Sequence, residues 1–160
     1  MFSKEWIENS FIQKSKDEKK RFKNFLQRVK VKKVLKDLPE LHRDAFEKID
    51  CLDCARCCKN HSPQFKTPDL KRISKHLRLK EGEFIEQYLK LDEDNDYVLK
   101  SSPCTFLNDD NTCQIYEVRP SDCARYPYTD EDVFLKRKAL TLKNTEVCPA
   151  AWLVLKNLSS

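Results

Sequence analysis

Apolar residues in the first 36 positions recur at helical spacing. This stripe comprises Phe22, Phe25, Leu26, Val29, Val34 and Leu35. Phe2, Trp6 and Ile7 form an earlier patch of similar spacing, and Pro39 interrupts the pattern. Because side chains three and four positions apart share one face of an α-helix, the pattern predicts one long helix or two shorter ones before Pro39.

The same spacing predicts further short helices along the chain. A helix with Leu41, Ala45, Phe46 and Ile49 on one face precedes Cys51. Thr67-Pro68-Asp69 is typical of a helix start, with Thr67 as the cap. The helix that begins there ends near Gly82. Amphipathic helices are also expected at 84–89 and 150–158. The segments 97–99 and 114–116 are interpreted as two short strands, with helical or irregular structure as the alternative.

Composition supports a mainly α fold with at most two or three short strands. The chain has 160 residues, of which 36% are charged and only one, Gly82, is glycine. Tight β-turns and phosphate-binding loops need glycine, so a β-rich fold and a nucleotide site of the P-loop or Rossmann type are not expected.

The chain shows no apolar run of the length of a signal peptide or a membrane span. We therefore expect a cytoplasmic protein in a reducing environment, where structural disulfides are uncommon. In that environment a cysteine-rich sequence is typical of metal binding.

Eight cysteines are the candidate metal ligands. They are Cys51, Cys54, Cys57, Cys58, Cys104, Cys113, Cys123 and Cys148. The first four form a C-x2-C-x2-C-C array, whose short spacers let thiolates converge on one centre, as in zinc sites and iron–sulfur clusters. Four clustered and four dispersed thiols can fill two four-ligand sites, or one cluster with spare thiols nearby. Thiol redox chemistry without a metal is the alternative.

The cofactor is a zinc ion or an iron–sulfur cluster. Zinc sites usually add a second C-x2-4-C pair or an H-x3-5-H pair, which is missing here. His61 is the one histidine near the array and is a possible ligand, although a single loop histidine is more often solvated. Cys51, Cys54 and Cys57 with a remote Cys148-Pro149 are similar to a ferredoxin arrangement, which slightly favours iron–sulfur.

The acidic segment 92–96 begins like a calcium loop. Its sixth position is Tyr97 instead of glycine, and its twelfth is Pro103 instead of glutamate. An EF-hand is rejected on those grounds.

The segment 14–36 is strongly basic. It holds eleven Lys or Arg residues against Asp17 and Glu18, whereas the whole chain has a net charge of +5. Such a helix suits nucleic acid or an anionic membrane surface, but a solvated outer face is the more common reason for such a run. The sequence thus divides into a basic N-terminal helical extension, 1–40, and a cysteine-cluster metal-binding domain, 41–160.

The arrangement of motifs resembles the YkgJ-like cysteine-cluster family of zinc- or iron-chelating domains. The motifs are C-x2-C-x2-C-C from Cys51, then Cys104-Thr-Phe-Leu, Cys113-Gln-Ile-Tyr, Arg119-Pro and Cys123-Ala-Arg-Tyr-Pro. The resemblance covers about residues 50–150. It implies a cysteine-ligated metal and gives no specific reaction.

Three functions follow as hypotheses. The first is a metal-binding protein without enzymatic activity. The second is a metal-dependent enzyme or an accessory factor that modifies another protein, which would then be its partner. The third is a nucleic-acid-binding protein that uses the basic segment 14–36. Whether the chain is an enzyme is left open.

Overall fold

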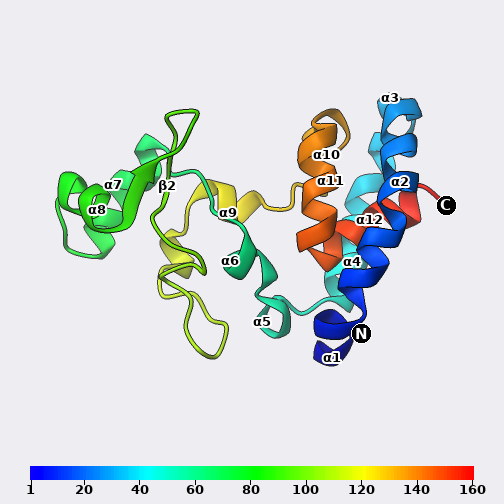
Figure 1. The fold of residues 1–160 in the computed structure, drawn as a ribbon. Coiled ribbons are helices and arrows are strands. Elements are labelled where there is room, and N and C mark those ends of the chain that lie inside the picture. Colours follow the sequence, from blue (N-terminus) through cyan, green and yellow to red (C-terminus); the bar gives the residue numbers. More distant parts are fainter. The chain divides into compact units, whose positions relative to one another are not determined.

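The computed structural model describes residues 1–160 and confirms a mainly α fold with one two-stranded antiparallel sheet (Figure 1). None of its helices is long and apolar enough to cross a membrane. The chain forms two compact units, each with its own hydrophobic core. Unit 1 comprises Met1–Cys54 and Pro127–Ser160, and unit 2 comprises Ala55–Tyr126.

Unit 1 is entirely helical. Its elements are α1 (Lys4–Asn9), α2 (Phe11–Arg28), α3 (Val31–Val34), the 3-10 helix η1 (Leu35–Asp37), α4 (Leu38–Lys48), α5 (Cys51–Cys54), α10 (Val133–Lys136), α11 (Lys138–Val147) and α12 (Pro149–Leu158). The last helix is the centre of this unit, and it contacts α2, α4 and α11. Residues 149–155 are all buried, because this helix is apolar on every side.

The N-terminal apolar stripe packs into the core of unit 1. Phe22 and Leu26 on α2 are fully buried, and Phe11 meets the Trp152 ring edge-on with their centroids 6.1 Å apart. The segment before Pro39 forms four pieces, so the prediction of one or two helices is wrong in number. Breaks at Ser10 and Val29 separate α1, α2 and α3. Residues 1–40 thus share a compact unit with 41–54 and 127–160.

Unit 2 alternates short elements with long turns. Its elements are α6 (Arg56–Asn60), α7 (Thr67–His76), α8 (Glu81–Tyr88), β1 (Leu89–Leu91), β2 (Tyr97–Leu99), the 3-10 helix η2 (Tyr116–Val118) and α9 (Ser121–Arg125). Ile73 from α7 and Phe84 from α8 are fully buried, and Phe106 and Ile115 from the cysteine-bearing turns join the same core.

The sheet is a hairpin that pairs Leu89 with Leu99 and Leu91 with Tyr97. The strand predicted at 97–99 is confirmed. The strand predicted at 114–116 is wrong, because the chain turns there. Gln114 N–H donates to the Phe106 carbonyl at 2.9 Å, and Tyr116 begins η2.

Two helix boundaries differ from the prediction. The N-cap of α7 is Lys66, not Thr67, and the Asp69 carboxylate accepts the Lys66 N–H at 2.9 Å. This helix ends at His76, and Gly82 lies inside the first turn of α8. The predicted final helix at 150–158 is confirmed as α12.

Candidate metal centre

The C-x2-C-x2-C-C array is divided between two short helices. Cys51 and Cys54 begin and end α5, whereas Cys57 and Cys58 lie in α6. Between them, Ala55 has a φ of 45°, in the left-handed region that L-residues other than glycine seldom adopt. A continuous helix is therefore impossible at this point, and the first two cysteines belong to unit 1 while the last two belong to unit 2.

Unit 2 brings together four thiols from three separate segments. Cys104 N–H donates to the Cys58 carbonyl at 2.8 Å, which joins the array to the first dispersed cysteine. Removal from water raises the pKa of the thiols of Cys104, Cys113 and Cys123, and negative charge on Cys58 raises each of these pKa values further. The charges of Cys104 and Cys113 also raise the pKa of Cys123. The four sulfurs therefore lie within electrostatic range of one another.

Cys58 differs from the other three thiols of this group. A hydrogen bond with Cys57 lowers the pKa of Cys58 to about 7, against the cost of burial, and the positive charges of His61 and Lys59 act in the same direction. Cys58 is thus the first of the four to ionise, and its charge then disfavours ionisation of its neighbours.

This donor set fits a cysteine-ligated metal. Neighbouring thiols repel one another once they are thiolates, and a bound cation would reverse that repulsion because each thiolate would become its ligand. A four-thiolate set is the ligand chemistry of structural zinc sites and of iron–sulfur clusters.

Backbone amides support the sulfurs of two of these cysteines. The backbone N–H groups of Phe106 and Leu107 lower the pKa of Cys104, and that of Ile115 lowers the pKa of Cys113, each against the larger effect of burial. A bridge between Leu107 and Cys113 holds the two turns together. The charge of Arg119 also lowers the pKa of Cys113.

Cys123 lies in α9, and hydrogen bonds to the buried carboxylate of Asp69 fix the start of that helix. Asp69 Oδ1 accepts the Ser121 N–H at 3.0 Å and an Arg72 Nη2–H at 2.8 Å. Arg72 also donates to the Arg119 carbonyl at 2.8 Å. Sequence reasoning missed both partners, because Asp69 was noted only as part of a helix start. No local signal connects it to a segment about fifty residues later.

His61 lies within electrostatic range of Cys58 and faces a carboxylate. Its Nε2 is 3.7 Å from Asp122 Oδ2 and has no hydrogen bond, and its ring stacks on Tyr126 with centroids 4.6 Å apart. Burial opposes ionisation of Asp122, but His61 and the N–H of Gln64 outweigh it and lower the pKa of the carboxyl group. The other histidines lie elsewhere. His42 is hydrogen-bonded to Thr129 at 2.7 Å, and His76 is exposed at the end of α7.

A second group of thiols lies in unit 1. Removal from water raises the pKa of Cys148 to about 12, and the charges of Cys54 and Cys51 raise it further. The backbone N–H groups of Ala150 and Ala151, in the first turn of α12, act in the opposite direction and lower the pKa of Cys148. Cys148 is the N-cap of α12, the central helix of unit 1.

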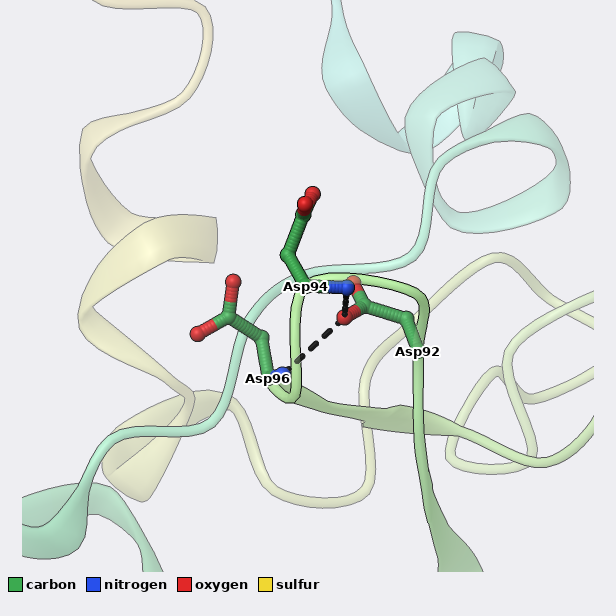
Figure 2. Close-up of side chains that lie close together, drawn as sticks. All are labelled: Asp92, Asp94 and Asp96. Atoms are coloured by element: carbon green, nitrogen blue, oxygen red, sulfur yellow. Dashed lines mark hydrogen bonds between the residues drawn. The ribbon is translucent and has the colours of Figure 1, made fainter.

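Three carboxylates form a separate cluster in the hairpin loop of unit 2 (Figure 2). One oxygen each from Asp92, Asp94 and Asp96 lies within 4.8 Å of the others. Asp92 Oδ1 accepts the N–H groups of Asp94 and Asp96 at 2.9 and 3.0 Å, so this carboxylate stabilises the turn itself. The loop joins two strands instead of two helices, consistent with the rejection of an EF-hand.

Comparison with known proteins gave one match. No curated protein and no solved structure matched the chain. Residues 50–149, which include all eight cysteines, match the CxxCxxCC family model, described as "Putative zinc- or iron-chelating domain". The match covers more than half of the chain and the resemblance noted in the sequence is confirmed: the protein belongs to the CxxCxxCC family of zinc- or iron-chelating domains.

Proposed function

We propose that this protein binds metal at two separate cysteine-ligated centres, one in each unit. The observation that carries the proposal is the joining of cysteine-bearing segments within unit 2, where the Cys104 N–H donates to the Cys58 carbonyl at 2.8 Å and a bridge links Leu107 with Cys113. The cysteines of these segments form no disulfide, and a shared cation would stabilise their thiolates as neighbours.

The unit 2 centre is a closed site with a structural role. Four thiolates complete a tetrahedron and leave no position for substrate, which is the arrangement of structural zinc sites. Its ligands also hold the surrounding fold, since the neighbouring Phe106 and Ile115 side chains are core residues. Metal binding at this centre therefore adds to the folding free energy of unit 2.

The unit 1 centre uses Cys51, Cys54 and Cys148. Two-residue spacing in the array and the Cys148-Pro149 pair are the features that favour an iron–sulfur cluster here. Cys57 continues the two-residue spacing along the sequence, and the experiment below assigns it to one of the two centres.

Metal analysis of anaerobically purified protein tests the proposal. Zinc, iron and acid-labile sulfide are measured per chain, with an absorption spectrum, for the wild type and for Cys113→Ser, Cys148→Ser and Cys57→Ser. We expect Cys113→Ser to lose the zinc and keep iron and sulfide, and Cys148→Ser to do the reverse. Cys57→Ser should match one of them. Ser101→Ala, an exposed residue near Cys104, is the control and should keep both metals.

Two results would contradict this assignment. If either variant lost all metal in one step while it remained folded, the eight cysteines would serve a single shared centre. A folded wild-type protein with no metal and with freely titratable thiols would remove the metal-binding function altogether.

A further inference from the structure

Helix α2 presents its basic residues to solvent because its apolar residues are used in the core. Phe22 and Leu26 are fully buried, whereas the lysines and arginines of 14–36 are exposed. Eight of the nine lysines in this segment take part in no ion pair; they are Lys14, Lys16, Lys20, Lys23, Lys30, Lys32, Lys33 and Lys36. The positive charge of this surface is therefore largely uncompensated within the protein.

One flank of α2 also lines a cavity of about 400 Å³. The lining residues are Arg21, Asn24, Phe25, Arg28, Val29 and Ser159. Arg21 and Arg28 are seven positions apart, which is about 10 Å along a helix and nearly two turns, so they lie on the same side. Asn24 lies between them, and the half-buried Phe25 and Val29 give the cavity an apolar part.

The two guanidinium groups retain donors for a ligand. Arg21 Nε is 2.6 Å from Glu18 Oε2, and 43% of the Arg21 side chain is exposed. Arg28 has no acidic partner, and its Nε–H reaches only the Asn24 carbonyl, at 3.4 Å. Guanidinium N–H groups that are not used by an acidic side chain suit phosphate oxygens, because the planar guanidinium offers several N–H groups at once.

The combination of cations and an apolar cavity selects among polyanions. Insertion of α2 into an anionic membrane would need an exposed apolar face, and the apolar face of α2 is inside the core. Double-stranded nucleic acid offers phosphates but keeps its bases stacked. A single strand offers both phosphates and unpaired bases, the latter suited to stacking on an aromatic ring.

We propose that the cavity between Arg21 and Arg28, with the lysines of α2, α3 and η1 around it, binds single-stranded nucleic acid. The guanidinium and ammonium groups bind the phosphates, and the Phe25 ring stacks on a base. This inference goes beyond the metal centres and does not depend on them, since every residue that it uses lies in unit 1 outside the cysteine groups.

Fluorescence anisotropy with labelled 15-nucleotide single-stranded RNA and DNA tests the proposal on the metal-loaded full chain. Binding of either strand is expected at 50 mM salt, with a Kd of roughly 1–100 µM that weakens at 200 mM. Arg21→Gln/Arg28→Gln should reduce affinity by about tenfold or more. It should also reduce the slope of log K against log salt by about 1.4, because two phosphate contacts are lost. Phe25→Leu should reduce affinity for single strands by about tenfold and leave duplex binding unchanged.

The matched control is Arg43→Gln/Arg78→Gln, which removes two exposed arginines elsewhere. Its salt slope should stay that of the wild type. All variants are compared at equal metal content and equal helical circular dichroism. The proposal is overturned if the wild type fails to bind at 50 mM salt, if both double variants weaken binding equally, or if duplex binds as tightly as single strands. Binding to phosphatidylglycerol vesicles but not to nucleic acid would also overturn it.

Discussion

At the scale of single residues, Asp69 shows how unit 2 positions a ligand from a distance. It is the only charged residue among the fully buried positions, with 1% of its surface exposed. Its carboxylate accepts hydrogen bonds from Lys66 N–H, Ser121 N–H and Arg72. These donors come from the start of α7 and from the segment that leads to Cys123. A buried carboxylate needs such donors, because an unpaired buried charge is costly.

Asp69→Asn should destabilise unit 2. The amide group replaces an acceptor with a donor that faces other donors, so we expect the free energy of unfolding to fall by about 2 kcal/mol. The chelator-induced loss of metal should also become faster. Urea unfolding and metal transfer to a coloured chelator measure these effects, with the exposed Asp109→Asn as control. Equal behaviour of the two variants would mean that Asp69 does not support the centre.

At the scale of elements, the patterns identified helices better than their ends. Helical spacing predicted α4, α7, α8 and α12, since each has an apolar face that must be buried. Apolar spacing did not predict how the first 36 residues divide into helices, and it did not predict the turn at 114–116. There the backbone follows hydrogen bonds between turns, such as Gln114 N–H to the Phe106 carbonyl, which no local periodicity contains.

The central position of α12 leads to a prediction for that element. Leu155 is fully buried among α12 and its neighbours. Leu155→Ala should therefore lower the free energy of unfolding by about 2–5 kcal/mol through lost burial and a cavity. Leu158→Ala, on the same helix but only partly buried, should cost clearly less. Thermal unfolding followed by circular dichroism makes the comparison. Similar losses for both would show that the core tolerates collapse around position 155.

At the scale of the whole molecule, the chain has two cores of unequal size and one group of cysteines in each unit. The core of unit 1 is built from long helices, whereas that of unit 2 depends on turns that carry cysteines. A small core with long turns gains little from burial alone, and the proposed metal centre would supply the missing stability.

Metal removal should therefore affect the two units differently. After treatment with a chelator under reducing conditions, amide hydrogen exchange should accelerate more in residues 55–126 than in α2 and α12. The reason is that ligand-bearing turns lose their shared cation, while the helical core keeps its apolar contacts. Hydrogen exchange with mass spectrometry gives the comparison, and reloading with zinc should restore protection. Equal acceleration in both units would contradict a metal-dependent fold confined to unit 2.

The sequence by itself determined the ligand type, the helical character and the family. Eight cysteines in a recognisable order and a nearly glycine-free chain are local properties that can be read without coordinates. The tertiary structure decided which cysteines meet. Cys58 shares unit 2 with Cys104, Cys113 and Cys123, whereas the dispersed Cys148 shares unit 1 with Cys51 and Cys54. Spacing along the chain could not show this division of the cysteines between the units. It depends on the left-handed conformation of Ala55 and on two separate cores that bring distant segments together.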